Sequence, residues 1–124
     1  MSRSSDREKS VWVAKHTVLR VLPARARRGM EHDLRERHYA RGEVVYSELE
    51  SPRIVWIVKE GRVRLMRYSS SGRAFALRVV TEGDLFCIPS IMNACPYPCR
   101  AIADADAILL TLSAKVFRLL LERY

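Results

Sequence analysis

The sequence has 124 residues, of which 48% are hydrophobic and 29% charged, and its formal net charge is +8. This length and composition fit one soluble globular domain with a modest core. No apolar run approaches the roughly 18 residues that a membrane span needs, and the polar start lacks the hydrophobic stretch of a signal peptide. We therefore expect a cytoplasmic protein.

The positive charge is concentrated in the first third of the chain. Residues 1–41 contain 11 Lys and Arg against 5 Asp and Glu, whereas residues 42–124 contain 11 against 9. Such a segment can attract nucleic acid or an anionic ligand, or it can be the solvated face of a helix. The solvated face is favoured, because no aromatic residues alternate with the arginines as base stacking requires. The arginines concerned are Arg25, Arg27, Arg28, Arg35, Arg37 and Arg41.

A helical segment is predicted after a polar leader. Trp12 is the large apolar side chain of the N-terminal part and is expected to pack on the following β-structure. Pro23 ends the first apolar stretch, and the composition from Ala24 to Arg37 favours helix, with a break expected at Gly29. We assign residues 1–36 to a basic leader and this helical segment.

From about residue 38 to residue 112 the pattern is that of short antiparallel strands. Runs rich in β-branched and aromatic residues are separated by turn signals at roughly 8–12-residue spacing, which is typical of a sandwich or barrel. The stretch 88–98 breaks this rhythm because it contains three prolines, which cannot donate to a strand ladder. We expect a mostly β protein, a jelly-roll β-barrel over residues 37–112 with flanking N- and C-terminal helices. The predicted strands are 44–46, 54–58, 62–68, 75–80, 85–86, 100–103 and 107–112.

A final helix is predicted over residues 113–124. Ser113 is a candidate N-cap, because its hydroxyl can accept a hydrogen bond from a backbone N–H group of the first turn. An apolar face follows the cap, formed by Val116, Phe117, Leu120 and Leu121.

The sequence contains no arrangement that predicts catalysis. His16, His32 and His38 all precede the predicted strands, so they do not line the interior of a barrel as the ligands of a metal-dependent cupin do. No glycine-rich phosphate-binding loop is present. The carboxylates among the strands all fall in predicted turns, at Glu82, Asp84, Asp104 and Asp106. We expect a binding domain rather than an enzyme.

The three cysteines do not match a metal-site pattern. Cys95 and Cys99 flank a stretch with two prolines, and Cys87 lies eight residues before Cys95. Structural metal centres usually take four Cys or His ligands, and disulfide frameworks are rare in cytosolic proteins. We predict buried structural thiols and assign no metal. A thiol or metal redox sensor using Cys87, Cys95 and Cys99 is the alternative.

Five short motifs follow one another along the chain. They are Gly42-Glu43-Val44-Val45-Tyr46, the run from Ile54 to Val58 with Gly61 after it, the hairpin at Gly72, Gly83-Asp84-Leu85-Phe86, and Arg100-Ala101 with the closing Phe117, Leu120 and Leu121. In this order they resemble the cyclic-nucleotide-binding domain, in particular the sensor domain of CRP/FNR-type bacterial transcription regulators. The resemblance covers about residues 37–124. It implies a jelly roll in which a loop-helix element between two late strands holds the ligand phosphate.

The resemblance places the ligand site between Phe86 and Arg100. Arg100 matches the family's phosphate arginine, although it could instead be a structural arginine paired with Asp104 or Asp106. Nucleotide-binding members have Gly-Glu after the aromatic residue, and this sequence has Cys87-Ile88. Ile88 cannot accept the ribose hydrogen bond, and an unpaired buried polar group costs roughly 1–3 kcal/mol. The implied site residues are Phe86, Cys87, Ile88, Ser90, Arg100 and Ala101.

We therefore expect the effector-sensing domain of a CRP/FNR-family regulator with a degenerate cyclic nucleotide site. A less polar small-molecule effector would suit a pocket lined by Phe86, Cys87, Ile88, Ile91 and Met92. The alternative is a stand-alone module that binds a cyclic nucleotide through Arg100. Family members carry a dimer helix and a helix-turn-helix after this domain. The resemblance thus implies a homodimer that contacts DNA through a separate domain beyond Tyr124.

Overall fold

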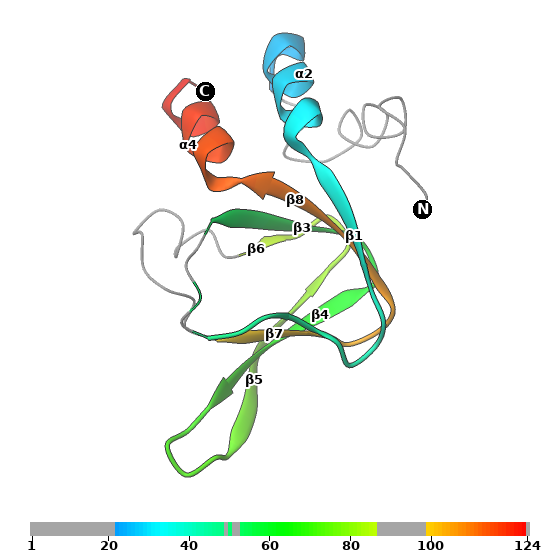
Figure 1. The fold of residues 1–124 in the computed structure, drawn as a ribbon, viewed down its shortest axis with the longest axis vertical. Helices are drawn as coiled ribbons and strands as arrows, with labels where there is room; N and C mark the ends of the chain where they lie inside the picture. The colour runs from blue at the N-terminus through cyan, green and yellow to red at the C-terminus, as the bar shows by residue number, and fades with distance from the viewer. Residues whose placement is uncertain (1–21, 49, 51–52, 87–98, 124) are drawn as a thin grey trace.

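Two four-stranded antiparallel sheets and two helices make up the fold (Figure 1). The computed structural model describes residues 22–48, 50, 53–86 and 99–123. One sheet has the strand order β1-β8-β3-β6 and the other β2-β7-β4-β5, so the chain passes repeatedly from sheet to sheet. The elements are α2 (Ala24–Asp33), β1 (Arg35–Tyr39), β2 (Val44–Tyr46), β3 (Ile54–Glu60), β4 (Arg62–Tyr68), β5 (Ala74–Thr81), β6 (Leu85–Phe86), β7 (Arg100–Ala103), β8 (Ala107–Ser113) and α4 (Ala114–Arg123).

The predicted mostly β jelly roll with flanking helices is confirmed, but its closure into a barrel is not. Within the described residues, the edge strands of one sheet do not pair with those of the other. Two of these edges, β2 and β6, have only three and two residues.

The first sheet separates two hydrophobic cores. Successive side chains of a strand point to opposite faces, so β3 and β8 contribute to both cores. Trp56 and Leu109 lie in the cluster between the sheets. Val55, Ile57 and Leu110 lie in the cluster beneath α2 and α4. Burial on both faces explains the continuous apolar run of β3, in which no polar residue alternates.

The N-terminal helix is shorter than predicted and is not broken. It starts after Pro23 as expected and ends at Asp33, whereas helix was predicted up to Arg37. Gly29 lies inside it, in a position where a Cβ atom would meet nothing within 4 Å. Beyond the helix, fully buried Leu34 has an extended backbone, and the chain continues into β1.

The position of His38 also differs from the prediction. It lies within β1, opposite Ile108 of β8, and not ahead of the strands. Its side chain is 57% exposed, and its Nε2 atom lies 3.2 Å from Glu36 Oε2. His38 therefore belongs to a strand but points into solvent.

The start of α4 confirms the predicted cap and ties the two helices together. The backbone N–H of Val116 donates to Ser113 Oγ at 3.1 Å. The backbone N–H of Ser113 donates to Asp33 Oδ2, at the end of α2, at 2.6 Å. In the described ranges, neither helix is long and apolar enough to cross a membrane.

Candidate functional site

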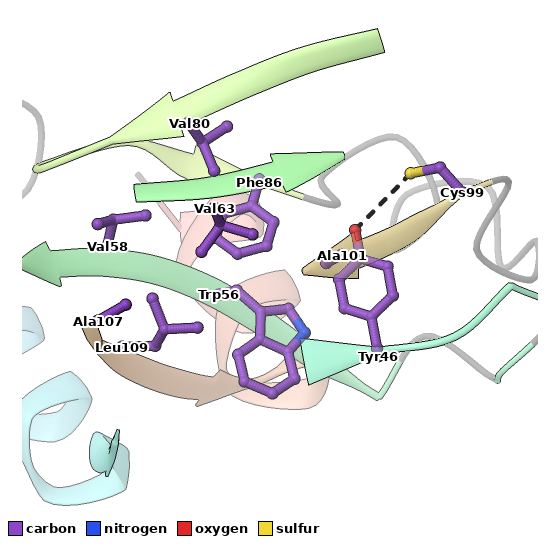
Figure 2. Close-up of a cluster of buried hydrophobic side chains, with 10 residues drawn as sticks. All are labelled: Tyr46, Trp56, Val58, Val63, Val80, Phe86, Cys99, Ala101, Ala107 and Leu109. Atoms are coloured by element: carbon purple, nitrogen blue, oxygen red, sulfur yellow. Dashed lines mark hydrogen bonds between the residues drawn. The ribbon is translucent and has the colours of Figure 1, made fainter. Parts of the chain in front are cut away.

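An aromatic cluster fills the space between the two sheets (Figure 2). The ring of Trp56 on β3 stacks on that of Phe86 on β6, with centroids 6.4 Å apart and planes at 20°. Tyr46 on β2 lies against both, at 6.1 Å from Trp56 and 6.3 Å from Phe86. These strands meet here because β3 pairs with β6, while β2 belongs to the facing sheet.

Two residues of the predicted ligand site and one cysteine of the alternative thiol site belong to this cluster. Phe86, Cys99 and Ala101 are all buried members of the cluster, at 2%, 5% and 0% exposure. Figure 2 shows them on the same side of the interior as Tyr46. The remaining predicted residues, and Trp12, lie outside the described residues, so their predictions stay untested. They are Cys87, Ile88, Ser90, Ile91, Met92 and Cys95.

Cys99 is a buried thiol, as predicted for the cysteines. Its Sγ atom lies 4.0 Å from the hydroxyl oxygen of Tyr46. Burial raises the pKa of the Cys99 thiol above its usual value of 9.0, and the contact with Tyr46 opposes this only in part. A thiol with a raised pKa stays protonated at neutral pH and is a poor nucleophile and metal ligand.

Arg100 points away from the aromatic cluster. Its neighbours Cys99, Ala101 and Ala103 are all buried, and alternate residues of a strand face opposite sides, so Arg100 lies on the outer face of the second sheet. There its guanidinium carbon is 4.8 Å from the ring centroid of Tyr68. Its Nε atom is 3.2 Å from Glu48 Oε1, without the alignment of a hydrogen bond.

The predicted structural partners of Arg100 were wrong. Asp104 lies near two other arginines, Arg62 at 3.3 Å and Arg64 at 2.9 Å. Asp106 accepts a hydrogen bond from the backbone N–H of Arg41. The carboxylate that lies beside Arg100 is that of Glu48, and not that of Asp104 or Asp106. Whether Arg100 also binds a ligand phosphate stays a prediction. A phosphate would first have to compete with the Glu48 carboxylate.

Trp56 has an unsatisfied hydrogen-bond donor. The residue is only 3% exposed, and its indole Nε1 atom has no hydrogen-bond partner among the described residues. In Figure 2 the indole nitrogen lies on the side of the ring nearest Tyr46. The guanidinium carbon of Arg37 lies 5.5 Å from the Trp56 ring centroid. Buried donors are normally paired, so this indole can donate to an acceptor atom of a bound molecule.

A hollow of 460 Å³ lies at the turn end of the sandwich and is lined by His38, Tyr39, Glu43, Glu60 and Asp106, among others. The Glu43 carboxylate accepts a hydrogen bond from the backbone N–H of Ala40. The Asp106 carboxylate accepts one from the backbone N–H of Arg41. These acids hold the surrounding turns in shape.

A family model described as the cyclic nucleotide-binding domain matches residues 36–124. The chain belongs to this family. The match covers both sheets and α4, and it includes every strand that contributes to the aromatic cluster. A comparison with curated proteins found no match.

Solved structures of two transcriptional regulator domains and of a kinase regulatory subunit have the same fold. The sensor domain of the transcriptional regulator DNR from Pseudomonas aeruginosa is 18% identical with a TM-score of 0.85, over 94% of this chain and 79% of its own. The N-terminal domain of a Streptomyces coelicolor transcriptional regulator is 23% identical with a TM-score of 0.74, over 90% and 78%. A guanosine-bound regulatory subunit of a cAMP-independent protein kinase A from Trypanosoma cruzi is 18% identical with a TM-score of 0.85, over 94% and 41%. At such identities the likeness establishes the fold.

Other relatives are longer than this chain. A matched chain from Ruegeria pomeroyi, 23% identical with a TM-score of 0.83, is covered over 54% of its length. The chain thus spans about half the length of that relative.

The sequence prediction missed four residues around the site. Tyr46 and Trp56 were assigned to strands as apolar residues, with no role between the sheets. Their aromatic character in two separate strands was the available signal. Glu48 and Tyr68 lie 52 and 32 residues before Arg100, so nothing local in the sequence connects them to it.

Proposed function

We propose that this chain is the effector-sensing domain of a CRP/FNR-type transcription regulator, and that its cyclic nucleotide site is degenerate. Membership of the cyclic nucleotide-binding domain family supports ligand binding rather than catalysis. The likeness to two regulator domains, each covered over more than three quarters of its length, supports the regulatory role.

The observation that carries the degenerate site is the orientation of Arg100. The arginine that the resemblance assigns to the ligand phosphate faces outward, beside the Glu48 carboxylate and the Tyr68 ring. A carboxylate at 3.2 Å already neutralises the guanidinium and repels a second anion. In addition, Ile88 stands where nucleotide-binding members have a glutamate. Two of the polar contacts that a cyclic nucleotide requires are therefore weakened.

The apolar surroundings of the predicted site suit a less polar effector. Tyr46, Trp56 and Phe86 supply aromatic surface, and the Trp56 indole supplies one unsatisfied donor. A small apolar molecule with a single acceptor atom matches this chemistry better than a charged nucleotide. The guanosine-bound kinase subunit shows that the fold also takes ligands other than cyclic nucleotides.

The proposal extends to the whole protein. The regulator would act in the cytoplasm as a homodimer and contact DNA through a separate helix-turn-helix domain. Reading the coding sequence on the C-terminal side of Tyr124 tests this directly. A coding sequence without a helix-turn-helix there would argue for a stand-alone binding module.

Calorimetry with cyclic AMP and cyclic GMP tests the degenerate site. We expect no binding in the micromolar range to the wild-type chain or to Arg100→Ala. Arg25→Ala is the matched control, because Arg25 is an exposed arginine on α2. Micromolar binding of either nucleotide that Arg100→Ala abolishes and Arg25→Ala retains would refute the proposal and establish the cyclic-nucleotide-binding alternative.

A further inference from the structure

The longest edge of the second sheet is formed by β5. Within the described residues, β5 (Ala74–Thr81) pairs only with β4, and the other edge strand of this sheet, β2, has three residues against eight. The β4–β5 hairpin projects beyond the body of the sandwich (Figure 1). A long edge strand presents a row of backbone donors and acceptors to which another extended chain can add.

The exposed side chains of β5 are unusually apolar. Phe75, Leu77 and Val79 are 45%, 48% and 44% exposed, and Val80 is the only buried residue of the strand. Phe75 lies opposite Arg67 and Val79 opposite Arg64. Because Arg64 and Arg67 are three residues apart on β4, Phe75 and Val79 lie on opposite faces of the hairpin. No single flat surface can cover both faces, whereas a strand added along the edge touches both.

The same hairpin is strongly basic. Arg67, Arg73 and Arg78 have no carboxylate within ion-pair distance among the described residues. Arg62 and Arg64 share the single carboxylate of Asp104. The hairpin therefore carries an excess of positive charge that nothing in the described part neutralises.

We propose that the free edge of β5 binds an extended, acidic segment of a partner protein by adding it as a further strand. Main-chain hydrogen bonds would supply affinity, Phe75, Leu77 and Val79 would contact alternate apolar side chains, and the arginines would select an acidic sequence. A second copy of this chain is disfavoured, since each copy would bring the same excess of positive charge to the shared edge. Nucleic acid is disfavoured because Phe75 is the one aromatic side chain of β5, whereas single-stranded nucleic acid is bound by several rings on which successive bases stack.

The test uses the full chain and two blocked synthetic peptides of the length of β5, one alternating glutamate with valine and one alternating lysine with valine. Hydrogen exchange of β5 amides and fluorescence anisotropy of the labelled peptides report binding. We expect the glutamate peptide alone to slow exchange in β5. Arg73→Glu with Arg78→Glu should weaken binding roughly tenfold, because two attractions become repulsions.

Two further variants separate the edge from general charge effects. Arg25→Glu with Arg28→Glu makes the same change of charge on exposed positions of α2 and should alter binding less than twofold. Phe75→Ser with Leu77→Ser keeps every arginine and should also weaken binding.

Four outcomes would overturn the proposal. Equal losses from the β5 and α2 charge reversals would mean unspecific attraction. Unchanged β5 exchange would mean that the edge is not used. Protection of β5 by a DNA oligonucleotide but not by the peptide would assign the hairpin to nucleic acid. Concentration-dependent protection in the protein alone would assign it to a second copy.

Discussion

Gly61, in the turn between β3 and β4, has no room for a side chain. Its φ angle is +93°, and a Cβ atom there would lie 2.5 Å from the carbonyl oxygen of Asp106 and 2.8 Å from Ala107 Cα. Both are backbone atoms where the turn after β7 enters β8, so neither can rotate away. We predict that Gly61→Ala costs the left-handed strain of about 1–2 kcal/mol plus overpacking of about 1–3 kcal/mol, or roughly 2–5 kcal/mol of the free energy of unfolding.

Substitutions at two other glycines separate the cost of the backbone strain from the cost of overpacking. Gly42 has a φ of +89° with nothing within 4 Å of an added Cβ, so Gly42→Ala should cost only the strain of about 1–2 kcal/mol. Gly29 lies within α2 in open space, so Gly29→Ala should stabilise by about 0.5–1 kcal/mol. Urea unfolding followed by tryptophan fluorescence, with buried Trp56 as a probe, measures all three. If Gly61→Ala cost no more than Gly42→Ala, the close approach of the two turns would not be what excludes a side chain.

Three further predictions concern the site. Burial raises the pKa of the Cys99 thiol, so above pH 9.0 the folded state keeps a proton that the unfolded chain loses. The contribution of the protonated thiol to the free energy of unfolding is complete below pH 9.0 and is lost as the pH rises through the folded-state pKa. The free energy of unfolding of the wild type minus that of Cys99→Ala should therefore decline above pH 9.0, and a constant difference would contradict this. Glu48→Gln removes the carboxylate beside Arg100 and should strengthen binding of inorganic phosphate in calorimetry, an effect that must disappear when Arg100→Ala is added. Cys87→Gly with Ile88→Glu restores the family's Gly-Glu pair and should raise cyclic nucleotide affinity about tenfold or more in the same assay, by supplying the missing acceptor; unchanged affinity would mean that this pair is not what limits binding.

Much of the fold could be predicted from turn residues and strand-like runs. The strand starting at Arg35 could not. Its sequence, Arg-Glu-Arg-His-Tyr, has no apolar alternation, and it extends because its backbone pairs with β8 while Leu34 is buried beneath the helices. The composition up to Arg37 favours helix locally, and this tertiary pairing overrides that preference.

Part of the predicted site could be located in the structure, while its role in binding a ligand stays a prediction. Phe86, Cys99 and Ala101 do meet between the sheets. The outward direction of Arg100 follows from Cys99, Ala101 and Ala103, the small apolar residues that alternate with polar or larger ones over residues 99–103 and face the interior. This alternation is present in the sequence, but the prediction followed the family motif instead. Its partner Glu48 could not be predicted, since their proximity depends on the pairing of β2 with β7, which has an irregular register.

Because β3 and β8 are buried on both faces, they tolerate few kinds of substitution. On an ordinary two-faced strand, every second position accepts polar substitutions. Here Ile57 faces the helices while Val58, next in the chain, faces the aromatic cluster, and neither has any exposed surface. The doubly buried positions of β3 and β8 can therefore change only among residues of similar volume that suit an apolar environment. Among the strands, we therefore expect family members to vary most where one face stays free, as in β4 and β5.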